Sequence, residues 1–140
     1  MKVESKRRRD EAKFQTQFGK WVMRMHDGYT GSKCWELKIT QTNSLPFSEV
    51  KPHQNRALWL ASTPGKKLYY KMADEGFSQK PFDCFMINVA DAYVVIKYML
   101  YPMEFVMIQA DVFAKEDKTS RRRSLTRERA LELGIEYAIK

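Results

Sequence analysis

Five apolar residues near the start of the chain recur at the spacing of one helical face. They are Phe14, Phe18, Trp21, Val22 and Met25. Because they lie at i, i+4, i+7, i+8 and i+11, they predict a helix over residues 10–26 with this stripe against the core. At about 100° per residue, Glu11 falls inside the stripe. Its carboxylate either occupies a frayed first turn, where the helix dipole favours an acid, or belongs to a functional site.

A strictly alternating segment predicts the first strand. It reads Cys34-Trp35-Glu36-Leu37-Lys38-Ile39. Its three large apolar side chains share one face, so Glu36 and Lys38 share the other.

Further strands are predicted at residues 68–70, 84–87, 92–98 and 105–108. The run 92–98, AYVVIKY, is almost continuously apolar and rich in β-branched residues, which is typical of a strand covered on both faces. We therefore expect it at the centre of the sheet. Pro52 is suited to the first turn of a helix over about 52–61, and Thr126 to the cap of a last helix that runs to about Ile139.

Helices at both ends around five short strands predict a mixed α/β (α+β) fold, with a mixed central sheet flanked by helices. The length of 140 residues is near the modal domain size, and 44% of the residues are hydrophobic, so we expect a single domain over residues 1–140. No apolar run reaches the roughly 18 residues of a membrane span, and no apolar segment follows the basic N-terminus. We expect a cytoplasmic protein that does not contact a membrane.

The net charge of +8 is concentrated in two segments. Residues 1–13 hold six Lys or Arg against three acids, and residues 115–129 hold seven against three. Basic segments around a nearly neutral body are typical of proteins that bind polyanions. We therefore predict that Arg7, Arg8, Arg9, Arg121, Arg122 and Arg123 contact a nucleic-acid backbone; the alternative is a solvated tail and a solvated loop. Cys34 and Cys84 have no spacing that suggests a zinc site or a disulfide framework.

Glu36 and Lys38 form a pair that suits phosphodiester hydrolysis. A carboxylate can hold Mg²⁺, which prefers oxygen ligands, and an adjacent ammonium can orient water or stabilise charge on phosphate. Most such pairs on strands are surface ion pairs, so the pattern alone is weak. Asp83 adds to it, because this acid opens an aromatic and apolar strand directly after Lys80, and a buried acid needs a cation or a donor.

Together these segments resemble the PD-(D/E)xK nuclease superfamily and, within it, the archaeal-type Holliday junction resolvases, including phage-encoded relatives. The resemblance extends from about Phe14 to Lys97. It rests on the segments WELKIT (35–40), NSLPFS (43–48), PHQ (52–54), KPFDCF (80–85) and AYVVI (92–96).

The resemblance implies a function and a set of roles. Such enzymes are homodimers that use Mg²⁺, or Mn²⁺ in its place, to cut two opposed strands of a four-way DNA junction. It implies that Asp83 and Glu36 are metal ligands, assisted by the Leu37 carbonyl, and that Lys38 positions water. Glu11 would be the outer acid. Gln54 resembles the polar residue that some of these nucleases place beside the metal, although a glutamine in a first helical turn is often only solvated. Lys80 is expected to contact DNA.

The order of the motifs departs from the family in one respect. The aspartate strand normally precedes the Glu-x-Lys strand, whereas Asp83 follows Glu36. We interpret residues 67–87 as the usual first hairpin, transplanted to a position after the helix that carries Gln54. Asp27 is the alternative aspartate, because a tight turn at residues 31–32 would bring it opposite Glu36. Gln15 and Gln17 are alternatives to Glu11.

The favoured function is a structure-specific endonuclease that resolves branched DNA, in the cytoplasm, or in the host cytoplasm if the chain is phage-encoded. Two alternatives remain open. One is a nuclease of the same superfamily that acts on flap, nicked or linear duplex DNA, because catalytic residues do not choose the substrate. The other is a basic DNA-binding module without catalytic activity.

Overall fold

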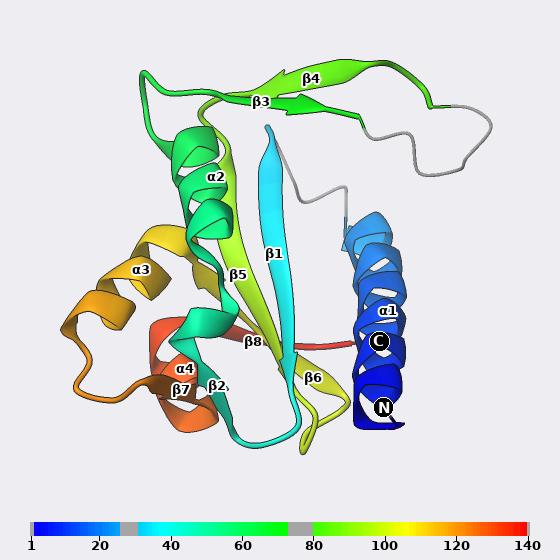
Figure 1. Cartoon of the computed structure of the whole chain (residues 1–140), viewed down its shortest axis with the longest axis vertical. Helices are drawn as coiled ribbons and strands as arrows, with labels where there is room; N and C mark the ends of the chain where they lie inside the picture. Colours follow the sequence, from blue (N-terminus) through cyan, green and yellow to red (C-terminus); the bar gives the residue numbers. More distant parts are fainter. Residues whose placement is uncertain (1, 26–30, 73–79, 140) are drawn as a thin grey trace.

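A four-stranded mixed sheet forms the centre of the molecule, with helices on both faces (Figure 1). The computed structural model describes residues 2–25, 31–72 and 80–139. The sheet has the order β1-β5-β6-β8, built from β1 (Lys33–Thr40), β5 (Asp91–Tyr98), β6 (Glu104–Gln109) and β8 (Ile135–Ala138). β1 and β5 are parallel, and the other pairs are antiparallel. The expectation of a mixed sheet flanked by helices is confirmed.

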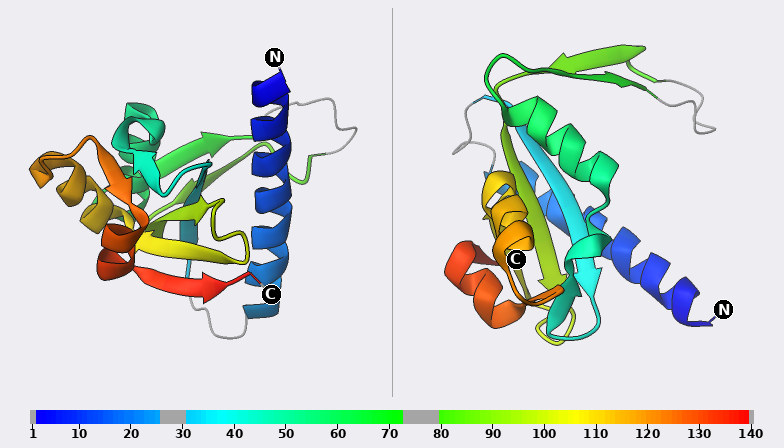
Figure 2. Two further views of the ribbon diagram at one scale, coloured as in Figure 1. Left: turned by 90° about the horizontal axis from the view of Figure 1, so that it is seen from below. Right: turned by 60° about the vertical axis from the view of Figure 1, so that its left-hand side comes forward.

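Helix α1 (Lys2–Met25) covers one face of this sheet (Figure 2). Phe14, Phe18 and Trp21 are buried there against Ile39 and Phe105. The predicted stripe is therefore correct for Phe14, Phe18, Trp21 and Val22, whereas Met25 is exposed. The helix begins at Lys2 rather than at residue 10, so the three arginines of the predicted arm are helical.

The other face carries α2 (Pro52–Ser62), α3 (Ala110–Thr119) and α4 (Arg127–Leu133). α2 connects β1 to β5, and its Leu58 is buried in a core that also contains Val94, Ile96, Phe113 and Ala130. Val95, by contrast, is buried on the α1 face. The apolar run of β5 thus fills both cores, which confirms its predicted central position.

Two small two-stranded sheets complete the fold. In one, β2 (Ser44–Pro46), which leads into the 3-10 helix η2 (Phe47–Glu49), pairs with β7 (Ser124–Thr126). In the other, β3 (Leu68–Lys71) pairs antiparallel with β4 (Cys84–Ile87). This second pair confirms the hairpin predicted between α2 and β5. It lies beyond the end of the sheet at which β1 begins (Figure 1).

The predicted last helix to Ile139 is wrong in its second half. α4 ends at Leu133, Gly134 follows, and β8 then pairs with β6. A Cβ at Gly134 would lie 2.4 Å from the Met107 backbone oxygen, so the chain needs glycine to reach the sheet. α3 was not predicted. Among the described helices, none has the length and apolar content that crossing a membrane requires.

Candidate active site

Glu36 and Lys38 lie side by side on β1. The Lys38 Nζ is 3.3 Å from Glu36 Oε1, and the two side chains are 17% and 26% exposed. Side chains of a strand alternate between faces, and Leu37 packs on the α1 side. The pair therefore belongs to the face that α2 covers. β1 ends the strand order of the main sheet, so the pair lies at the sheet edge.

A cavity of about 220 Å³ opens at this edge, between α1 and the start of α2. It brings together five of the predicted residues, which are Glu11, Glu36, Leu37, Lys38 and Gln54. Arg7, Gln15 and Glu49 also line it. Three segments far apart in sequence thus meet at one place, which makes it the best candidate for a functional site.

Glu11 reaches this cavity from the middle of α1. Because the helix begins at Lys2, the interpretation of a frayed first turn is wrong. The Glu11 carboxylate is 3.3 Å from Arg7 Nε. Of the two alternatives to Glu11, Gln15 lines the same cavity, whereas Gln17 accepts a hydrogen bond from Lys97 elsewhere.

Gln54 is held by the start of α2. Its side-chain oxygen accepts a hydrogen bond of 2.9 Å from the Lys51 backbone N–H, which forms part of a capping box. The residue is half-buried and lines the cavity. The capping hydrogen bond therefore fixes the Gln54 amide beside the carboxylates. The side chain of a merely solvated glutamine would not be held in this way.

Glu49 was missed as a member of the site, and its partner Arg7 was predicted only as a DNA contact. Arg7 Nη2 lies 2.6 Å from Glu49 Oε2, and this hydrogen bond, aided by the charges of Glu49 and Glu11, raises the pKa of Arg7. The ion pair joins α1 to η2 across the edge of the cavity. Forty-two positions separate the two residues, and no local pattern in the sequence relates them.

The donors around the cavity are chemically those that Mg²⁺ prefers. They are the carboxylates of Glu11, Glu36 and Glu49, the Gln54 side-chain oxygen and the Leu37 carbonyl. Within the described residues, no three His, Cys, Asp or Glu side chains are grouped closely enough to ligate one ion. The side chains around the cavity therefore suit a hard cation in their chemistry, while Mg²⁺ binding itself stays a prediction.

Asp83 is not brought to this cavity in the structure. It precedes β4, its side chain is 88% exposed, and its carboxylate is 3.5 Å from Lys80 Nζ. Asp27 lies outside the described residues. The expected burial of Asp83 is therefore wrong, and the assignment of either aspartate to the metal stays a prediction.

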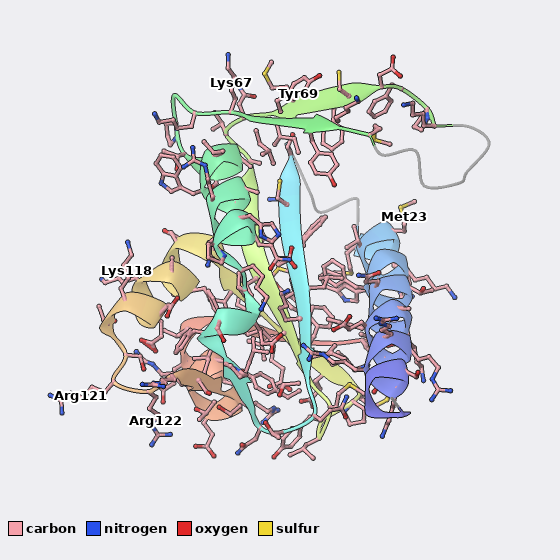
Figure 3. All side chains as sticks on the ribbon, in the orientation of Figure 1. Met23, Lys67, Tyr69, Lys118, Arg121 and Arg122 are labelled. Atoms are coloured by element: carbon pink, nitrogen blue, oxygen red, sulfur yellow. The ribbon has the colours of Figure 1, made fainter. Side chains whose placement is uncertain are left out.

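The predicted DNA contacts are on the surface. Arg8, Arg9 and the three arginines at 121–123 are exposed. Figure 3 shows Arg121 and Arg122 extending outward from the turn between α3 and β7. This turn is tied to η2 by a 3.0 Å hydrogen bond from Phe47 N–H to the Arg123 carbonyl. It therefore lies beside the segment that carries Glu49.

The geometry combines an acid–base pair, further oxygen donors and surface cations. Comparison of the chain with protein-family models, with curated proteins and with solved structures found no match.

Proposed function

We propose that the protein is a Mg²⁺-dependent endonuclease that hydrolyses phosphodiester bonds of branched DNA, with four-way junctions as its preferred substrate. The observation that carries the proposal is the placement of Glu36 and Lys38 in one cavity with Glu11 and Gln54. The resemblance of the segments around these residues to junction resolvases adds the substrate class.

Each residue has a definite task in this reaction. Hydrolysis requires water to attack phosphorus, one P–O ester bond to break, and the departing oxygen to receive a proton. Lys38 is suited to orient the water and to offset negative charge that develops on phosphate. Its half-buried position strengthens that interaction relative to open water. The side chains of Glu36 and Gln54 supply oxygen ligands, and Mg²⁺, when bound, supplies a Lewis acid that polarises the phosphate.

The acids also argue against a DNA-binding module without catalysis. Glu11, Glu36 and Glu49 line the cavity, and phosphate would be repelled there unless a cation intervened. The proposal leaves the metal-binding aspartate open between Asp83 and Asp27. It includes a homodimer, because matched cuts in two strands of a two-fold junction require two sites.

The test is incubation of the protein with labelled four-way junction, matched linear duplex and flap DNA, each with Mg²⁺ and with chelator. We expect paired, symmetric cuts in the junction only when Mg²⁺ is present. Glu36→Gln and Lys38→Ala should abolish cleavage while junction binding survives, because both side chains serve hydrolysis rather than affinity.

Glu128→Gln and Lys118→Ala are the matched controls. Both residues are exposed, and Figure 3 places Lys118 on the opposite side of the molecule from α1. They should leave cleavage unchanged. Cleavage of linear duplex as efficient as cleavage of the junction would instead indicate a flap or duplex nuclease. Absence of Mg²⁺-dependent cleavage of all three substrates would refute the proposed function.

A further inference from the structure

A second and larger cavity adjoins the candidate active site. Its volume is about 840 Å³, and it shares Arg7, Ile39 and Glu49 with the smaller cavity. From there it continues along the turn after β1 to Pro46 and Ser124 on the β2–β7 pair. The two cavities thus adjoin at these three residues. Together they are called the edge groove, which extends from Glu36 to Ser124.

The start of α1 forms one wall of the edge groove without being packed into the core. Among the described side chains of this helix, Phe14 is the first that is fully buried, and residues 5–9 are exposed. Polar contacts hold this part of the helix instead. Gln41 Nε2 donates to Asp10 at 3.0 Å, and Arg7 donates to Glu49 at 2.6 Å. The start of α1 is therefore held in place by polar contacts that a competing anion can replace.

The opposite wall is preformed. The hydroxyls of Thr40 and Thr42 both donate to the Ser44 carbonyl, at 2.8 and 2.9 Å, which fixes the turn between β1 and β2. A ligand that enters the groove would not have to order this turn, so little binding energy would be lost there.

The chemistry of the groove suits a polynucleotide strand. Lys6 and Arg7 supply cations for phosphates, and the exposed Pro46 supplies apolar surface for a sugar or base. The end at Ser124 adjoins the exposed arginines at 121–123. A volume of about 840 Å³ is that of a small-molecule site, which is enough for a few nucleotides of one strand.

We propose that the edge groove binds one strand of DNA next to the scissile phosphate, and that a backbone phosphate of this strand takes Arg7 from Glu49. The inference rests on the proposed function for the identity of the strand as DNA. It adds the path of the strand. It also identifies Glu49 as the residue that the strand displaces, because Glu49 and the phosphate compete for the Arg7 guanidinium.

Competition predicts opposite effects for the two members of one ion pair. Arg7→Ala removes the phosphate contact and should weaken strand binding by about tenfold, the typical effect of losing a charge-assisted hydrogen bond. The slope of log affinity against log salt should fall by about 0.7, the value for one phosphate of a single strand. Glu49→Gln frees Arg7 and removes a negative charge, so it should strengthen binding. A purely structural ion pair would give losses for both variants.

The experiment measures binding of a labelled single-stranded DNA oligonucleotide by fluorescence anisotropy, in chelator, over a series of salt concentrations. Lys20→Ala is the control, because Lys20 is an exposed cation of the same helix about 20 Å from Arg7; it should leave the affinity within about twofold. Arg7→Lys keeps the charge and should recover most of the affinity lost in Arg7→Ala. Melting temperatures of all variants establish that each one folds.

Weaker binding by Glu49→Gln, or unchanged binding by Arg7→Ala in a folded variant, would overturn the inference. Neither result depends on cleavage, because the assay contains no metal. If the wild-type protein shows no Mg²⁺-dependent nuclease activity but the two variants shift strand affinity in opposite directions, the proposed function fails and the strand groove stands.

Discussion

Lys97 Nζ on β5 donates a hydrogen bond of 3.0 Å to Gln17 Oε1 on α1. Lys97 is 4% exposed and is the one buried charged residue among those described. Its ammonium also lies 5.6 Å from the Phe14 ring centroid. A charged ammonium is therefore enclosed between the sheet and α1, within a strand whose sequence is otherwise almost entirely apolar.

This burial predicts a dependence of stability on pH. Desolvation, aided by the charge of Lys13 and opposed by Asp10, lowers the pKa of Lys97. Between the lowered value and about 10.5 the unfolded chain binds more protons than the folded one, so stability rises with pH in that window. Urea unfolding between pH 8 and 9.5 should show a steeper rise for wild type than for Lys97→Met. Parallel curves for these two proteins would contradict the prediction, and the exposed Lys20→Met should behave as wild type.

Tyr98 gives a prediction with the opposite sign. Its hydroxyl donates to the Leu125 carbonyl at 3.0 Å, and burial raises its pKa. Tyr98→Phe removes this buried hydrogen bond and should lower the free energy of unfolding by about 1 kcal/mol at pH 7.5. A raised pKa also means that the wild-type protein loses stability as pH rises above about 10, and the variant should lose less. Exposed Tyr70→Phe should do neither in the same denaturation series.

Replacement of glycine by alanine should have opposite effects on stability at Gly134 and at Gly19. Gly134→Ala would place a Cβ 2.4 Å from the Met107 backbone oxygen, and we expect a loss of about 2 kcal/mol or more. Gly19 lies within α1 and has no atom within 4 Å of an added Cβ. Gly19→Ala should therefore stabilise the protein by about 0.5–1 kcal/mol through helix propensity. Thermal melting of both variants checks the pair, and equal effects would mean that the approach of β8 to β6 is looser than described.

The choice between two aspartates is testable by metal linkage. A ligand that binds only the folded chain raises its melting temperature. If Asp83 is a metal ligand, Asp83→Asn should lose most of the Mg²⁺-induced rise and the Mg²⁺-dependent cleavage, whereas Asp27→Asn should retain both. The reverse result would assign Asp27 and would give the strand order of the nucleases that the sequence resembles.

Local sequence patterns were sufficient to predict much of the fold and about half of the residues of the candidate site. The alternation around Glu36 and Lys38, and the apolar run of β5, each report burial directly. α3 was missed because its segment is mostly charged, and its buried Phe113 has no repeating partner. β8 was missed because its four residues follow α4 after one glycine, so their pattern also fits a continuation of the helix. The Arg7–Glu49 contact depends on how far α1 extends past the core, and no local pattern encodes that.

The position of β1 at the end of the strand order has a consequence for how the protein moves. Among the described residues β1 pairs only with β5, so about half of its backbone amides lack a sheet partner. Edge strands open at lower free energy than central ones, and their amides exchange with solvent hydrogen sooner. The backbone amides of Leu37 and Ile39 point away from β5 in this parallel register, so they should exchange sooner than those of Val94 and Ile96. The candidate catalytic residues therefore lie on the strand that opens more easily, while β5 is paired on both sides.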